Sequence, residues 1–125
     1  MNIINIEKLD TNKTIVMTGR PNNVRKIAKH LQAILYYCPN VEDYFEDYPS
    51  IVQDLKETVK HENRVVIVTT QSAEFLDCLL ESNMDFIMVT VRKYDHDDED
   101  TYRLRVTTKE YAVENRRAWN YELRK

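Results

Sequence analysis

The chain has 125 residues, of which 42% are hydrophobic and 31% charged, with a formal net charge of −3 and one glycine. This length and composition predict a single globular domain over residues 1–125. The net charge argues against broad binding to nucleic acids or membranes. There is no apolar run of membrane-spanning length and no signal-peptide layout, so we expect a cytoplasmic protein without a membrane anchor.

The first third of the chain predicts two strands and a helix. Weak alternation predicts a strand at Asn2–Leu9, which a short turn joins as a hairpin to a second strand at Thr14–Thr18. The second strand is continuously apolar, as central strands are. After a loop at Gly19–Asn23, apolar residues at helical spacing predict a helix to about Tyr37. Pro39–Pro49 has no clear hydrophobic period, so the sequence predicts either a short helix or an irregular loop there.

The middle of the chain predicts a helix, a strand and another helix. Ser50 and Gln53 form a capping-box pattern, which opens a helix that ends near His61. An apolar run at Val65–Thr69 predicts a buried strand. Ser72 is placed to cap the third helix.

The last third predicts a hairpin and a final helix. Strands at Phe86–Tyr94 and Thr101–Val106 flank the charged sequence DHDDED, which is typical of a hairpin tip. Thr107 and Glu110 form another capping box. Strands that alternate with helices predict an α/β fold, whose mixed sheet is parallel at its centre, has antiparallel additions and carries helices on its faces.

The two cysteines, Cys38 and Cys78, form no CxxC motif and fall on or beside predicted helices. This pattern predicts free thiols rather than a disulfide or a metal site. The acidic DHDDED segment lacks the glycine and the distal glutamate of an EF-hand loop. We therefore predict no metal site and no cofactor.

The single glycine, Gly19, directly follows an apolar strand and directly precedes a helix. This position predicts a sharp turn with positive φ. Phosphate-binding loops occupy such positions, because a helix N-terminus offers free N–H groups and a partial positive charge. Pro21 fixes φ at the start of the helix, and Asn22 or Asn23 is placed to cap it.

Two segments of the chain share a pattern with a known family. The first is Thr18–Gly19 followed, after five residues, by Arg25–Lys26 and a helix; the second is VVIVTTQSAEFL at Val65–Leu76. Together they resemble the ABC-type ATPases of the archaeal and bacterial AAA group, in which a strand ending in Thr-His-Ser enters a similar helix. A hairpin and a helix ending in a Leu-Arg pair follow in that family, similar to Asp85–Arg124. The resemblance implies a reduced P-loop NTPase-like scaffold, of a kind that fits an archaeon or a mobile element.

The chain departs from the family at the positions that carry its chemistry. On the pattern GxxxxGK[ST], Gly19 keeps the first glycine, but Val24 replaces the second glycine, Arg25 the lysine and Lys26 the hydroxyl residue. Gln71 stands where the family has the histidine that senses the γ-phosphate. Hydrolysis needs phosphates, metal and water to be positioned together, so the resemblance implies a protein that is not an enzyme. The candidate anion- or nucleotide-binding residues are Gly19, Asn22, Asn23, Arg25, Lys26 and Gln71.

Three aromatic residues, Tyr44, Phe45 and Tyr48, lie within an acidic segment. They fit either core packing or an exposed patch that contacts a protein partner. With the loss of catalytic motifs, they lead to the first hypothesis: a non-catalytic protein-interaction module. Such a module would self-associate as a homo-oligomer or bind a partner, which could be an ATPase whose surface it imitates.

Two alternatives stay open. The chain could be a nucleotide-binding protein or feeble NTPase that uses the Gly19 loop. It could also bind nucleic-acid phosphates through the basic helix start at Arg20–His30. Acidic patches at 42–47 and 95–100 would repel a long polyanion, so we expect nucleic acid not to be the partner.

Overall fold

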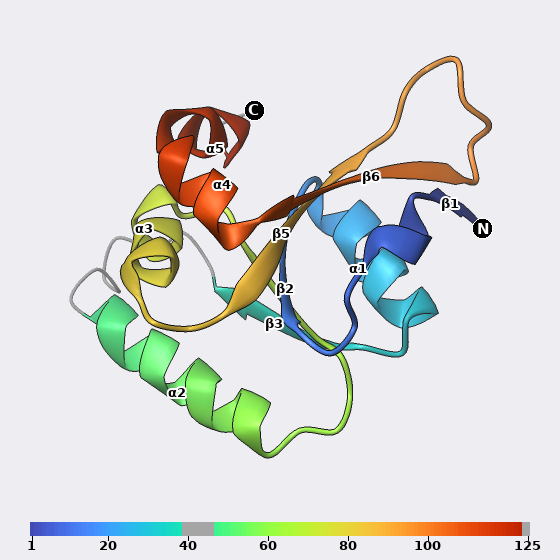
Figure 1. Cartoon of the computed structure of the whole chain (residues 1–125). Helices are drawn as coiled ribbons and strands as arrows, with labels where there is room; N and C mark the ends of the chain where they lie inside the picture. The colour runs from blue at the N-terminus through green and yellow to red at the C-terminus, as the bar shows by residue number, and fades with distance from the viewer. Residues whose placement is uncertain (39–46, 124–125) are drawn as a thin grey trace.

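The computed structural model describes residues 1–38 and 47–123, and Figure 1 shows their arrangement. The strands are β1 (Asn2–Ile4), β2 (Thr14–Thr18), β3 (Ile34–Cys38), β4 (Val66–Thr70), β5 (Phe86–Arg92) and β6 (Thr101–Thr108). The helices are the 3-10 turn η1 (Ile6–Lys8) and the α-helices α1 (Pro21–His30), α2 (Tyr48–Lys60), α3 (Ala73–Glu81), α4 (Lys109–Glu114) and α5 (Arg116–Leu123).

The strands form one mixed sheet in the order β1-β6-β5-β2-β4-β3. Only β5 and β6 pair antiparallel; the other neighbours are parallel. The α/β fold with a mostly parallel mixed sheet is therefore confirmed. Strand β2 lies between β4 and β5, and all five of its residues are buried, as its apolar sequence predicts.

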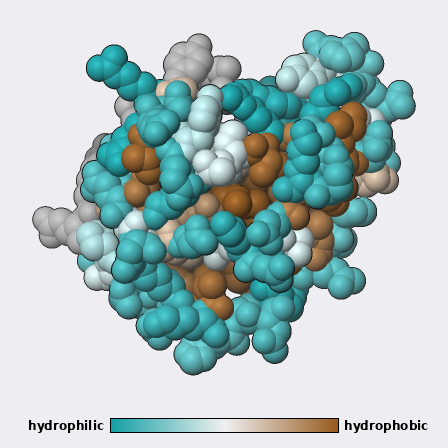
Figure 2. All heavy atoms as spheres, in the orientation of Figure 1, coloured by the Kyte–Doolittle hydropathy of each residue, from teal (hydrophilic) through white to brown (hydrophobic). Residues whose placement is uncertain are grey.

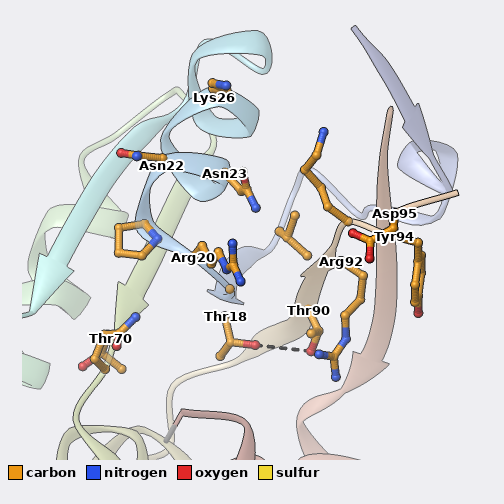
Figure 3. A pocket seen from close by; sticks show the side chains of 15 residues that line it. Thr18, Arg20, Asn22, Asn23, Lys26, Thr70, Thr90, Arg92, Tyr94 and Asp95 are labelled. Atoms are coloured by element: carbon orange, nitrogen blue, oxygen red, sulfur yellow. Dashed lines mark hydrogen bonds between the residues drawn. The ribbon is translucent and has the colours of Figure 1, made fainter. Parts of the chain in front are cut away.

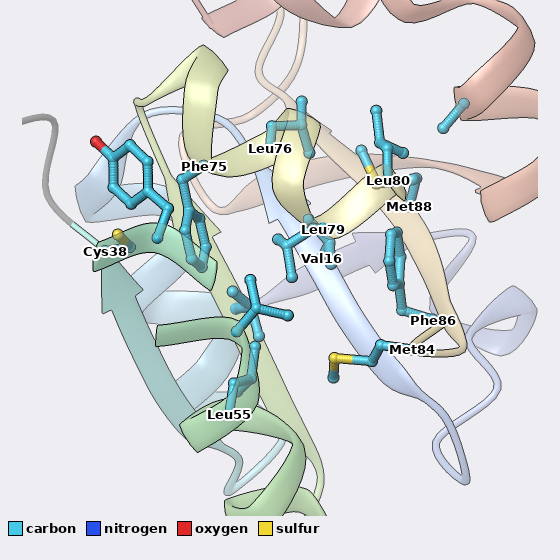
Figure 4. Close-up of a cluster of buried hydrophobic side chains, with 14 of the residues drawn as sticks. Val16, Cys38, Leu55, Phe75, Leu76, Leu79, Leu80, Met84, Phe86 and Met88 are labelled. Atoms are coloured by element: carbon cyan, nitrogen blue, oxygen red, sulfur yellow. The ribbon is translucent and has the colours of Figure 1, made fainter. Parts of the chain in front are cut away.

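The helices divide unequally between the faces of the sheet (Figure 1). Helix α1 and η1 cover one face, where Ile15 and Met17 of β2 point. Helices α2, α3, α4 and α5 cover the other, where Val16 points and where Phe75 and Leu79 of α3 are fully buried (Figure 4). Among the described residues, more buried side chains belong to the cluster on this face than to the cluster under α1, so this face holds the larger core. Each large apolar side chain contributes about 1.5–3 kcal/mol on burial.

The surface in the orientation of Figure 1 is hydrophilic at its rim, with some hydrophobic side chains visible towards its middle (Figure 2). The large hydrophobic residues that are exposed include Met1, Tyr37, Tyr94, Tyr111 and Val113. In the described part of the chain, no helix has the length and apolar character needed to cross a bilayer.

The predicted hairpin at the N-terminus is wrong. Strand β1 ends at Ile4 and pairs parallel with β6, with Asn2 opposite Thr101. The chain turns at Asn5, whose backbone is left-handed with φ 72°, and enters η1. The Asn5 side chain fixes this turn, because its Nδ2 donates to the Leu104 carbonyl at 3.0 Å. A turn residue thus interrupts the weak alternation that predicted one long strand.

The predicted helix to Tyr37 is also wrong, because α1 ends at His30 and residues 34–38 form the edge strand β3. The chain reverses at Gln32, where φ is 53°. The Arg64 side chain stabilises this reversal by donating to the Gln32 carbonyl at 3.1 Å. Short apolar runs fit both periods, so spacing alone could not separate this strand from more helix.

The helix boundaries follow the predictions in part. Ser72 caps α3 as predicted. Helix α2 begins at Tyr48 with Pro49 in its first turn, so the predicted box at Ser50 is wrong, although the helix ends near His61 as expected. The cap of α4 is Thr108, one residue after the predicted Thr107, and its Oγ1 accepts from the Tyr111 N–H at 3.1 Å.

The two cysteines are free thiols, as the sequence predicts. Cys38 is buried at the end of β3 rather than on a helix, and burial raises its pKa to about 11. Cys78 is half-buried on α3, where burial and nearby carboxylates, Glu81 among them, raise the thiol pKa. Raised pKa values disfavour the thiolate, so both side chains behave as small apolar groups.

Candidate anion-binding site

A hollow of about 1040 Å³ opens at the carboxyl ends of β2, β4 and β5 (Figure 3). The chain leaves β2 towards β3 but leaves β5 towards β6, in opposite directions along the sheet. The hollow therefore lies at a topological switch point, where open α/β sheets bind their ligands. Its lining is Thr18, Gly19, Arg20, Pro21, Asn22, Asn23, Lys26, Thr70, Gln71, Thr90, Val91, Arg92, Lys93, Tyr94 and Asp95.

Gly19 makes the sharp turn out of β2 with φ 150°, which confirms the positive φ expected there. A Cβ at this position would lie 3.1 Å from Val91 Cβ and 3.3 Å from the Val91 carbonyl oxygen. Both contacts are tighter than most real Cβ contacts, so Val91 would have to shift slightly to make room. The glycine thus serves the backbone conformation and the close approach of the turn to β5.

The first turn of α1, which follows Gly19 and Arg20, offers few backbone N–H groups to a ligand. Helix α1 starts at Pro21 directly after Arg20, whose backbone is extended. The N–H groups of Asn23 and Val24 both donate to the Arg20 carbonyl, at 3.0 and 3.1 Å. Since proline has no N–H, the first turn of α1 leaves only the Asn22 N–H for a ligand.

The side chains in this turn also differ from expectation. Neither Asn22 nor Asn23 caps α1, because its N-cap is Arg20 and makes no side-chain cap bond. The Asn22 Oδ1 instead accepts from Arg25 Nη1 at 3.1 Å. Val24, at the position of the second glycine of the family pattern, is fully buried in the core under α1.

The lining carries more positive than negative charge. Arg20 precedes α1 and Lys26 lies on α1, whereas Arg92 and Lys93 come from the end of β5. Asp95 is the one carboxylate among the lining residues. Positive side chains in a recess focus the field and concentrate anions there.

The four cations are not equally available. Within residues 1–38 and 47–123, neither Arg20 nor Lys26 takes part in an ion pair. Lys93 Nζ donates to the Glu99 carbonyl and lies 4.3 Å from the centre of the Tyr102 ring. Arg20 and Lys26 are thus the side chains most ready to meet an anion.

A row of threonines lines the hollow at the ends of three adjacent strands. Thr18 pairs with Thr90 in the register of β2 and β5, and their Oγ1 atoms are 3.2 Å apart (Figure 3). Thr70 ends β4 on the other side of β2; its Oγ1 donates to the Cys38 carbonyl at 3.0 Å and accepts from the Ser72 N–H at 2.9 Å. The exposed fractions of Thr18, Thr70 and Thr90 are only 3%, 2% and 3%.

The β4–α3 turn is held by buried side-chain hydrogen bonds. Ser72 Oγ accepts from the Phe75 N–H at 3.1 Å and donates to the Tyr48 hydroxyl at 2.9 Å. Tyr48 is 1% exposed and packs edge-on against Phe75, with the ring centres 5.6 Å apart. Tyr48 therefore belongs to the core, not to an exposed patch. Tyr44 and Phe45 lie outside the described residues.

The structure brings most of the predicted site residues together. Gly19, Asn22, Asn23, Lys26 and Gln71 line the hollow, whereas Arg25 does not. The part of the lining that comes from β5 and the residues directly after it, 90–95, was not among the predicted site residues. Arg92 and Lys93 follow an apolar strand, but only the long-range pairing of β5 with β2 puts them beside the Gly19 turn.

Comparison with known protein families, with curated proteins and with solved structures found no match for this chain. The resemblance to P-loop ATPases therefore stays a prediction. Among the described residues, no group of three or more His, Cys, Asp or Glu side chains is arranged to hold a metal ion.

Proposed function

We propose that this chain is a non-catalytic binding protein, built on a reduced P-loop ATPase-like scaffold, that takes a small phosphorylated ligand in the hollow. The observation that carries the proposal is the convergence of Arg20 and Lys26 with Arg92 and Lys93 at a topological switch point, opposite one carboxylate. Binding sites for small molecules are commonly about 300–1,000 Å³, and the hollow of about 1040 Å³ has room for a ligand of nucleotide size.

The composition of the lining supports binding rather than catalysis. Among the described residues, it contains no histidine, cysteine or glutamate, and Asp95 at its rim is its single acid. General acid–base chemistry and phosphoryl transfer both need positioned groups that give or take protons or organise water. Arginine and lysine instead hold phosphate oxygens through charge-assisted hydrogen bonds, which are roughly twice as strong as neutral ones.

Helix α1 contributes to the site through its partial charge more than through backbone N–H donors. Its N-terminus points at the hollow and carries a partial positive charge, but its first turn offers few free N–H groups. A ligand anion would thus depend on side chains, which makes Arg20 and Lys26 decisive. Their contribution should weaken as salt rises, because partly exposed charges are screened.

The protein-interaction hypothesis stays a prediction. Of its three aromatic residues, Tyr48 is buried, and the other two lie outside the described residues. No described surface replaces them as a specific anchor. The hypothesis of a nucleic-acid partner stays a prediction as well.

Calorimetric titration with inorganic phosphate, pyrophosphate and ADP tests the proposal. We expect binding that weakens at least about tenfold in the double variant Arg20→Ala/Lys26→Ala, since a hydrogen bond to a charged group contributes roughly 1.5–3 kcal/mol. Lys29→Ala is the matched control, because Lys29 is exposed on α1 but does not line the hollow. Absence of binding to all three ligands, or equal loss in the control, would contradict the proposal.

The non-catalytic part has its own test. Purified protein with ATP and Mg²⁺ should release no phosphate above the uncatalysed background. Sustained release that Lys26→Ala abolishes would show that the chain is an NTPase and that binding is only the first step of its activity.

A further inference from the structure

Two almost completely buried threonines contribute hydroxyl groups to the lining of the hollow. They are Thr18 and Thr90, the last residue of β2 and the residue paired with it on β5. Each side chain is 3% exposed, and their oxygens are 3.2 Å apart. Figure 3 shows the pair facing each other across the two strands.

The hydrogen-bond count of this pair is incomplete. Each threonine hydroxyl has one proton to donate, and the contact between Thr18 and Thr90 uses one of the two. Within the described part of the chain, neither hydroxyl makes a second hydrogen bond, so one of the two protons has no acceptor within the protein. Leaving a buried donor unsatisfied costs free energy, which a ligand oxygen at this place would recover.

The third threonine of the row, Thr70, has no such unused hydroxyl proton. Thr70 lies at the same level on β4, and its hydroxyl both donates to the Cys38 carbonyl and accepts from the Ser72 N–H. Its one proton is therefore used within the protein. The spare donor is therefore confined to the β2–β5 side of the hollow, where Arg92 and Lys93 also lie.

We propose that the Thr18–Thr90 pair binds a terminal phosphoryl oxygen, so that the hollow takes a phosphate monoester end-on. This inference rests on the proposed function and names the ligand class. Arg92 follows Thr90 by two residues on β5 and therefore projects from the same face of the strand, where a guanidinium can bind phosphate oxygens. The anion thus sits over β2 and β5 and not within a loop of backbone amides.

The depth of the pair determines which phosphates fit. A monoester presents three terminal oxygens at its end, whereas a diester carries an organic group on each side of phosphorus. Because the two threonines are each only 3% exposed, we expect that a phosphate flanked on both sides does not reach their hydroxyls. The site should therefore select small phosphate monoesters and reject the diester backbone of nucleic acids.

The first experiment compares glycerol 3-phosphate with dimethyl phosphate by NMR titration near pH 5. At that pH the monoester is mostly a monoanion, since its second pKa is about 6, so the two probes carry similar charge. We expect the monoester to bind at least about tenfold more tightly, because the diester loses at least one hydrogen bond between a hydroxyl and the charged phosphate. Equal affinities would overturn the end-on geometry.

The second experiment tests the hydroxyls themselves. In Thr18→Val/Thr90→Val both partners are removed, so no orphan hydroxyl remains and the melting temperature should change little. The affinity for inorganic phosphate should fall about tenfold. Thr14→Val is the control: Thr14 is buried at the other end of β2 and does not line the hollow, so this variant should leave the affinity unchanged.

The outcomes separate this inference from the proposed function. If the wild type binds phosphate and Arg20→Ala/Lys26→Ala removes binding, but Thr18→Val/Thr90→Val binds normally, only the inference is overturned. If no probe binds to the wild type, both are overturned. Should the double variant not fold, Thr90→Val and Thr90→Ser replace it; the inference requires loss in the first and retention in the second.

Discussion

Two strand-to-helix turns lie side by side at the carboxyl edge of the sheet, and they are stabilised in different ways. In the β4–α3 turn, Thr70 and Ser72 satisfy the backbone with buried hydrogen bonds, and Tyr48 of α2 joins them. In the β2–α1 turn, no side chain caps the helix, and the backbone is accommodated by Gly19 with φ 150°.

The contrast separates a structural turn from a candidate binding turn. Polar groups of the β4–α3 turn are buried and paired with one another, so they stabilise the junction of α2, β3, β4 and α3. Beside the β2–α1 turn, Arg20 and Lys26 of α1 make no ion pair among the described residues and line the hollow. Charges left unpaired contribute little to folding and are available to a ligand.

The largest effect on stability is expected at Gly19. Gly19→Val forces a β-branched residue to φ 150° and brings its Cβ to within 3.1 Å of Val91 Cβ. We expect a loss of at least roughly 1–3 kcal/mol from backbone strain, measured by urea unfolding. The matched control is Gln71→Val, at the equivalent exposed position after β4, with a change of about 0.5 kcal/mol or less. Equal stability of wild type and Gly19→Val would show that the glycine is incidental.

A smaller effect is expected from Ser72 in the other turn. Ser72→Ala removes the cap of α3 and the buried partner of the Tyr48 hydroxyl. We expect destabilisation of about 1–2 kcal/mol. Tyr48→Phe removes the partner from the other side, and the double variant should cost less than the sum of the two single changes, because they share one hydrogen bond. Strict additivity in this double-mutant cycle would contradict the shared bond.

The same comparison shows which features a sequence can predict. Strands β2 and β4 and the Ser72 cap depend on local patterns: continuous apolar runs and a capping residue before a helical period. Gly19 was predicted to have positive φ because it separates a strand from a helix. These features involve residues close together in the chain, so spacing and residue type were enough.

The features that were missed depend on pairings distant in sequence. Strand β1 pairs with β6 across the whole chain, and a left-handed Asn5 that directs this path has no distinctive pattern around it. Arg92 enters the hollow only because β5 lies next to β2. The site was therefore predicted on one wall, from the Gly19 turn, while its second wall needed the strand order.

The smallest effect is expected in the hairpin tip between β5 and β6, which is held by charge instead of buried hydroxyls. Asp97 accepts two hydrogen bonds at 2.8 Å from Arg103, one from Nε and one from Nη2. These bonds and the positive charge of Arg103 lower the pKa of the Asp97 carboxyl below its ordinary value. Because the folded-state pKa is the lower one, the stabilisation is present above the unfolded pKa of about 3.9 and is lost as the pH falls through the folded value.

Asp97→Asn should therefore reduce the free energy of unfolding slightly at pH 7, and the difference from wild type should shrink as the pH falls below about 4. Urea unfolding of both proteins across this range measures the difference, and NMR titration of Asp97 measures the pKa directly. Asp98→Asn is the control, since Asp98 is exposed in the same tip and makes no ion pair within the described residues. A difference that stays constant with pH would show that Asp97 acts through the shape of the tip and not through its charge.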